Sequence, residues 1–173
     1  MKKPDHVREI YLYPGEFYFG DQNSSIRTLI GSCVSVVMWH PTRLIGGMCH
    51  YMLPFHLGKD NKLDGRYAED AMQMFSKEVL SYGTTLQEYV IKVFGGASVF
   101  PGNTQKMPCR CGILPSREGI MACSNVACKN ISVIHLLAKQ YDLQITAQHM
   151  GGDNYRNLIF DIWSGEIRMK NGH

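Results

Sequence analysis

The sequence predicts an α+β fold, in which strands pair mostly in hairpins and helices occur singly. Two amphipathic helical segments are separated by short strands rich in β-branched and aromatic residues. Several of these strands follow one another across short turns, whereas a doubly wound parallel sheet would place a helix after each strand. The length of 173 residues is usual for one domain, so we expect a single domain over 1–173.

The N-terminal third of the chain is predicted to be β structure. The segment REIYLYPGEFYFG is typical of two short strands around Pro14 and Gly15, because aromatic and aliphatic residues alternate with polar ones. The runs VSVVMW at 34–39 and IGGMCHYML from Ile45 flank an HPT turn. We therefore expect these two runs to form a hairpin.

Two helices are expected from apolar residues at spacings of three and four. The first covers 67–80, with Gly83 as a C-terminal stop signal. The second covers about 125–141, with Ser124 as the candidate N-cap.

The remaining strands lie around these helices. YVIKVFGG lies between the helices, and QITAQH follows the second one. LIFDIW is predicted to close onto EIRMK through the two-residue turn Ser164-Gly165. The stretch at about 100–123 has no clear period, so we expect an irregular, cysteine-containing excursion there.

Composition excludes several classes of protein. With 45% hydrophobic and 19% charged residues, the chain is expected to be globular and not disordered. The formal charge is +3 and the basic residues are scattered, so no nucleic acid is expected as a partner. No apolar stretch follows the two lysines of MKKPDHVREI, so no export signal is expected, and no apolar run is long enough to span a bilayer. We expect a cytoplasmic protein with reduced thiols, no direct membrane insertion and no cofactor.

Cys33 and His50 are the candidate nucleophile and base. Gly31-Ser32-Cys33 precedes a strand, where backbone N–H groups can point outward as oxyanion donors. In the expected hairpin, opposed residue numbers sum to about 83 or 85, and either register puts Cys33 and His50 on one face. An even register would separate them. An imidazole beside a thiol stabilises the thiolate and protonates a leaving group, which suits acyl transfer.

Two neighbouring residues need separate interpretation. Thr28 is the nearest hydroxyl that could orient the imidazole of His50, although a β-branched residue is also ordinary in a strand. Cys49 directly precedes His50, and adjacent strand residues point to opposite faces. If His50 faces the site, Cys49 is expected to face the core.

The other four cysteines form a C-x-C pair followed by a C-x4-C pair. Four thiolates could hold zinc, but structural zinc sites favour two to four residues between paired cysteines, and C-x-C is tighter than that. Unrelated reduced thiols are the preferred interpretation and structural zinc the alternative. The residues concerned are Cys109, Cys111, Cys123 and Cys128.

The pair IRTLIGSCVSVVMW and IGGMCHYMLP resembles the signature of the CheD family of chemotaxis proteins. The resemblance continues through RYAEDAM, KVFGGASVF, NVACKNISVIHLL and MGGDNYRNLIFDIWSGEI, nearly the whole chain. It implies a three-layer α/β/β sandwich with mixed and antiparallel sheets. It also implies a receptor glutamine deamidase whose Cys, His and Thr correspond to Cys33, His50 and Thr28. The implied substrates are methyl-accepting chemotaxis receptors, and the implied partner is the phosphatase CheC.

Three function classes follow from the sequence. The first is a cysteine amidohydrolase that converts receptor glutamine to glutamate with release of ammonia. The second is a noncatalytic module that binds chemoreceptors or a CheC-like phosphatase. The third is another thiol acyltransferase or protease, which would use the same nucleophile on a different bond or acceptor.

Overall fold

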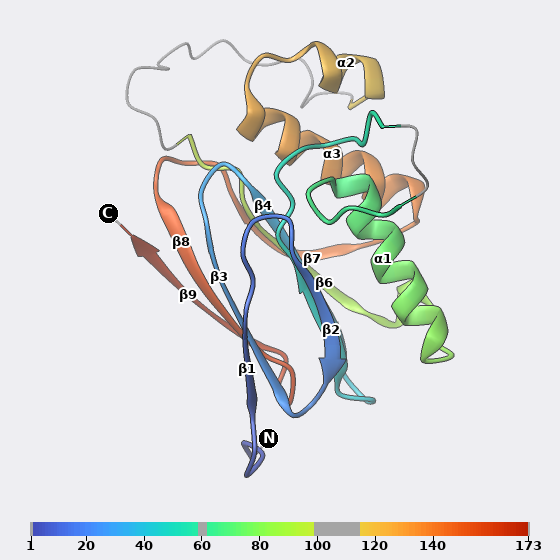
Figure 1. Cartoon of the computed structure of the whole chain (residues 1–173), viewed down its shortest axis with the longest axis vertical. Coiled ribbons are helices and arrows are strands. Elements are labelled where there is room, and N and C mark those ends of the chain that lie inside the picture. Colours follow the sequence, from blue (N-terminus) through green and yellow to red (C-terminus); the bar gives the residue numbers. More distant parts are fainter. Residues whose placement is uncertain (1, 59–61, 99–114, 173) are drawn as a thin grey trace.

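The computed structural model describes residues 2–58, 62–98 and 115–172. The chain forms three layers, with helices on one face of a five-stranded sheet and a four-stranded sheet on the other face (Figure 1). This arrangement confirms the predicted α+β class and the α/β/β sandwich. Among the described residues, no helix is long and apolar enough to cross a membrane.

The four-stranded sheet has the strand order β1-β3-β8-β9. Only β1 and β3 pair in parallel, and the other neighbours are antiparallel. The strands are β1 (Arg8–Tyr11), β3 (Ser24–Ile30), β8 (Tyr155–Asp161) and β9 (Glu166–Gly172). Strand β3, which lies between β1 and β8, was not predicted from the sequence.

The five-stranded sheet has the strand order β2-β5-β4-β6-β7. Its only parallel pair is β6 with β7, and the predicted hairpin of β4 and β5 lies at its centre. The strands are β2 (Phe17–Asp21), β4 (Val34–His40), β5 (Ile45–Cys49), β6 (Val90–Gly95) and β7 (Ile145–Met150). The two predicted N-terminal strands, β1 and β2, therefore belong to different sheets.

The helices pack on the outer face of the five-stranded sheet. The two main ones are α1 (Ala68–Ser81) and α3 (Val126–Gln140), accompanied by α2 (Arg117–Ala122) and the 3₁₀ turn η1 (Leu86–Glu88). Gly83 follows α1 at a φ of 67°, a conformation that favours glycine and ends helices, as predicted.

Side chains of β4 point alternately to its two faces and so contribute to two hydrophobic cores, one under the helices and one between the sheets. Val34 and Val36 pack toward the helices, whereas Val37 packs between the two sheets. Met48 on β5 lies opposite Val37 and shares its face. Burial of one such side chain stabilises the fold by roughly 1.5–3 kcal/mol. The central hairpin is therefore held on both faces, which fixes the positions of residues at its ends.

Two local predictions were wrong at helix and strand ends. The N-cap of α3 is Asn125 and not Ser124, because the Asn125 side chain accepts a 2.9 Å hydrogen bond from the Cys128 amide. Asp161 pairs with Glu166, so four residues, 162–165, connect β8 to β9 in place of a two-residue turn. Ile162 is buried between the sheets, which extends the connection.

The expected irregular stretch at about 100–123 contains an ordered helix in its described part. Ser116 caps α2 by accepting a hydrogen bond from the Gly119 amide, and Ile120 is buried against the helical core. The helix has six residues, too few to display a period in the sequence. Residues 99–114 lie outside the described part of the chain.

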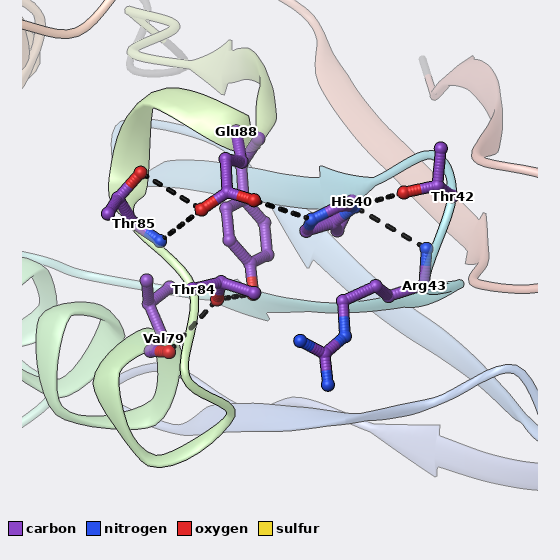
Figure 2. A network of polar contacts seen from close by, with 8 residues as sticks. His40, Thr42, Arg43, Val79, Thr84, Thr85 and Glu88 are labelled. Atoms are coloured by element: carbon purple, nitrogen blue, oxygen red, sulfur yellow. Dashed lines mark hydrogen bonds and ion pairs between the residues drawn. The ribbon is translucent and has the colours of Figure 1, made fainter.

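A polar network fixes the turn end of the central hairpin (Figure 2). The His40 imidazole lies between Glu88 of η1 at 3.3 Å and the Thr42 hydroxyl at 3.3 Å. The Glu88 carboxylate also accepts hydrogen bonds from the amide and hydroxyl of Thr85. This network joins η1 to the end of β4, and Cys33 precedes the other end of that strand.

Candidate active site

The hairpin register sets Cys33 and His50 on one side of the β4–β5 pair. Val34 bridges Tyr51, and Val37 pairs with Met48, so the register is the second of the two odd registers considered above. The same register puts His50 opposite Ser35 and one diagonal step from Cys33. The hairpin therefore has an odd register, which is the condition for Cys33 and His50 to share a face.

The imidazole of His50 lies between the two sheets and contacts β3. Its Nδ1 is 2.8 Å from the Thr28 hydroxyl, and the His50 side chain is almost fully buried. The Thr28 hydroxyl donates its single proton to the Leu12 carbonyl at 2.9 Å. Thr28 is itself fully buried, because alternate residues of β3 face the inner side of its sheet.

These contacts select one tautomer of His50. A hydroxyl that gives its proton to Leu12 can only accept from the ring, so Nδ1 must carry the hydrogen. The lone pair is then on Nε2, which is buried and has no hydrogen-bond partner among the described residues. An unpartnered buried ring nitrogen is costly for stability and is typical of a site where a substrate or nucleophile completes the contact.

Burial keeps both members of the pair neutral at rest. Desolvation lowers the pKa of His50 to about 4, and a hydrogen bond to the Leu12 carbonyl raises it by a smaller amount. Desolvation also raises the pKa of the Cys33 thiol, partly offset by its own backbone amide and the Ser32 side chain. Both shifts favour a neutral thiol and a neutral imidazole over a preformed ion pair.

Cys49 occupies the opposite face from His50, as predicted. It is fully buried in the core between the helices and the five-stranded sheet. Burial raises the pKa of its thiol to about 12. A thiol that is both enclosed and this hard to ionise is a packing residue.

The turn at Gly31, Ser32 and Cys33 is held by the backbone that follows β6. The Ala97 amide donates to the Gly31 carbonyl and the Gly96 amide to the Cys33 carbonyl, both at 2.8 Å. A Cβ at Gly95 would lie 2.2 Å from the Cys33 carbonyl oxygen, and Gly95 has a φ of 120°. Glycine is therefore required there for the two segments to approach.

Two polar residues near this site were missed by the sequence analysis. Asn130 of α3 is fully buried, and its Nδ2 donates to the carbonyls of Ser32 and Met52. Ser35 lies opposite His50, and its buried hydroxyl has no partner among the described residues. In the sequence, Asn130 is a polar residue on the apolar face of the predicted helix, next to Ile131. A helical pattern alone does not show why a polar residue is buried there.

The zinc alternative falls partly outside the described residues. Cys109 and Cys111 lie there, while Cys123 and Cys128 are half-buried near the start of α3. Desolvation, and after it the neighbouring Cys123 thiol, raise the pKa of Cys128. Within the described ranges, no group of three or more His, Cys, Asp or Glu residues is arranged to hold a metal ion.

Comparisons with known proteins agree with the resemblance seen in the sequence. A family model described as CheD chemotactic sensory transduction matches residues 52–171. The probable chemoreceptor glutamine deamidase CheD of Pseudomonas fluorescens is 41% identical over 167 residues, which cover 96% of this chain and 86% of the relative.

Two relatives from other bacteria carry the same description. CheD 1 of Leptospira interrogans is 39% identical over 170 residues, covering 95% of this chain and 93% of the relative. CheD 3 of Dechloromonas aromatica is 38% identical over 165 residues, covering 95% and 88%. With a family model that matches more than half of the chain and relatives aligned over nearly all of it, this protein belongs to the CheD family.

Proposed function

We propose that this protein is a chemoreceptor glutamine deamidase, a hydrolase that acts on side-chain amides, with Cys33 as its nucleophile. The observation that carries the proposal is the state of His50, whose Nδ1 contacts the Thr28 hydroxyl and whose buried Nε2 has no hydrogen-bond partner in the described part of the chain. The names of the relatives, all described as glutamine deamidases, supply the substrate class.

The first half of the reaction forms a thioester. His50 Nε2 takes the thiol proton as the Cys33 sulfur attacks the glutamine side-chain carbonyl carbon. The oxygen of the tetrahedral intermediate is stabilised by backbone N–H groups at Cys33, in the turn shaped by Gly31 and Ser32. The proton held on His50 then passes to the leaving nitrogen, so the C–N bond breaks with release of ammonia.

The second half of the reaction regenerates the enzyme. His50 Nε2 takes a proton from water, and the hydroxide attacks the thioester carbon. The C–S bond breaks, the thiolate regains the proton from His50, and the receptor leaves with glutamate in place of glutamine. Thr28 holds the ring in the required tautomer throughout, because Nδ1–H stays bound to its hydroxyl. No step requires a cofactor.

The proposal extends to the substrates, the partner and the cellular compartment. We propose the methyl-accepting chemotaxis receptors as substrates, a CheC-like phosphatase as a partner, and the cytoplasm as the compartment. The substrate proposal rests on the printed names of the relatives, and the partner proposal rests on the family resemblance alone. The single-domain organisation over 1–173 is part of the same proposal.

Ammonia release from purified receptor fragments tests this function. The native protein is expected to release ammonia, and Cys33→Ala is expected to release none above background. Cys49→Ala is the matched control, since it removes a thiol from the same hairpin on its other face. Receptor binding by the native protein with no ammonia would favour the noncatalytic module. Peptide cleavage or amine incorporation would indicate another thiol enzyme.

A further inference from the structure

Asn130 connects the two segments that carry the proposed nucleophile and base. Its Nδ2 donates to the Ser32 carbonyl at 3.1 Å and to the Met52 carbonyl at 2.7 Å. Ser32 immediately precedes Cys33, and Met52 follows His50 by two residues. One amide group on α3 therefore uses both of its protons to join the start of β4 to the chain just beyond β5.

The Ser32 contact also determines where the Cys33 amide points. The Ser32 carbonyl and the Cys33 N–H belong to one planar trans peptide unit, so they point in opposite directions. Asn130 holds the carbonyl toward α3, which directs the Cys33 N–H away from the helix. Among the described residues, this N–H donates to no other backbone carbonyl. It contacts the Cys33 thiol, whose pKa it lowers, and so lies beside the sulfur of the proposed nucleophile.

The three carbonyls of the turn have different partners. Gly31 and Cys33 accept from the backbone amides of Ala97 and Gly96, but Ser32 is held by a side chain. Asn130 is itself fixed, since the Tyr51 hydroxyl donates to its backbone carbonyl at 2.6 Å and the residue is fully buried. Its Oδ1 is buried without a partner among the described residues. A buried acceptor left unmatched is costly, and the two donated bonds offset this cost.

We propose that Asn130 is a positioning residue of the deamidase, which orients the Cys33 peptide unit and sets its distance from His50. It does not touch the reacting atoms. This inference rests on the proposed function for its kinetic consequence, but its effect on Cys33 is independent of any substrate. The residue is expected to act on the rate of the chemical step and not on receptor affinity.

Asn130→Asp is the sharpest test, because the two side chains have nearly the same shape. A protonated aspartic acid has one donor for the two carbonyls, and an ionised one has none. We expect kcat for ammonia release to fall roughly 10–100-fold with KM unchanged. The remaining activity should decrease further as pH rises and the introduced carboxyl ionises. The native protein should not show this decrease.

Asn125→Asp is the matched control on the same helix. The Asn125 side chain accepts from the Cys128 amide, and a carboxylate accepts there equally well. Its kcat should stay within about twofold of the native value, since the change removes no donor that the structure uses.

A second measurement separates this inference from the proposed function. The rate of Cys33 alkylation by iodoacetamide, followed by peptide mass spectrometry, needs no receptor. The Cys33 amide lowers the pKa of its own thiol, so a misdirected amide should slow alkylation near pH 8 by roughly 3–10-fold. If the native protein released no ammonia, the proposed function would be wrong. The alkylation rate of Cys33 would still show whether Asn130 positions the Cys33 peptide unit.

Two results would overturn the proposal. One is an Asn130→Asp protein with native kcat and native Cys33 alkylation. The other is a pair of variants, Asn130→Asp and Asn130→Ala, that both melt below the assay temperature, because Asn130 would then support the whole fold and not the turn. Folded variants with slow alkylation and reduced kcat support it.

Discussion

His40 and His50 are buried histidines of the same hairpin, and they differ in what their two ring nitrogens meet. In His40, Nε2 contacts Glu88 and Nδ1 contacts the Thr42 hydroxyl (Figure 2). In His50, Nδ1 contacts Thr28 and Nε2 has no partner among the described residues. An imidazole whose two nitrogens both have hydrogen-bond partners stabilises a turn. An imidazole with one partnered nitrogen and one unpartnered nitrogen can accept and donate a proton.

The charges around the two rings reinforce this difference. The Glu88 carboxylate faces His40, with its oxygen 3.3 Å from Nε2. Nδ1 of His50 lies 2.8 Å from the Thr28 hydroxyl, and burial lowers the pKa of His50 to about 4. Burial therefore keeps His50 a neutral base near neutral pH.

The largest expected effect comes from removing the open nitrogen. His50→Gln should reduce kcat for glutamine deamidation by roughly 10²–10⁴-fold, the usual contribution of general acid–base catalysis. Initial rates of ammonia release from a receptor fragment measure this effect. His40→Gln is the control, and equal losses in the two variants would show that the comparison of the rings is wrong.

The next effect should come from the residue that orients the ring. Thr28→Val keeps the branched shape but loses the hydroxyl, so the tautomer of His50 is no longer selected. We expect kcat to fall roughly 10–100-fold, as for the loss of one buried hydrogen bond in the transition state. Thr28→Ser retains the hydroxyl and should restore most of the rate. Native turnover by Thr28→Val would remove Thr28 from the mechanism.

The low pKa of His50 predicts that stability falls as the solution becomes acidic. The unfolded imidazole binds a proton below pH 6.5, but the folded one stays neutral until about pH 4. Protons therefore favour the unfolded chain within this window, and the free energy of unfolding should drop by about 2 kcal/mol between pH 7 and 5. Urea unfolding at several pH values measures the drop. His50→Gln should reduce it, and an unchanged pH slope in that variant would contradict the assignment.

The smallest effect should come from the other histidine. His40→Gln removes contacts to Glu88 and Thr42, so the free energy of unfolding should fall by about 1 kcal/mol. Turnover per folded molecule should not change, because the network lies at the opposite end of β4 from Cys33. Denaturant unfolding and ammonia release on the same sample check both expectations.

The sequence predicted the central hairpin well and its surroundings less well. Alternation and the HPT turn at 40–42 were sufficient to predict β4 and β5, and an odd register then put Cys33 and His50 on one face. Strand β3 was missed because the hydrophobic alternation around Ser24, Ser25 and Thr28 is weak. Ser24 and Thr28 are buried on the face that meets the second sheet, whereas Ser25 is buried on the other face beside Asp161.

The sequence offered Thr28 as the candidate hydroxyl for His50, but no strand pattern showed that the two residues are in contact. This contact joins two sheets, and no local pattern reports how one sheet packs on another. Asn130 is a more distant case, since its partners lie 98 and 78 residues away along the chain. The candidate nucleophile, Cys33, was proposed from sequence spacing, but the groups that would orient it depend on tertiary packing.

The most direct test of the account is site-resolved mass spectrometry of a receptor fragment incubated with the native protein or with Cys33→Ala. Conversion of glutamine to glutamate adds about 1 Da and leaves the backbone intact. The account predicts this shift at defined glutamines with the native protein and no shift with Cys33→Ala. Equal shifts with both proteins would contradict it, because the amide would then be hydrolysed without the Cys33 thiol.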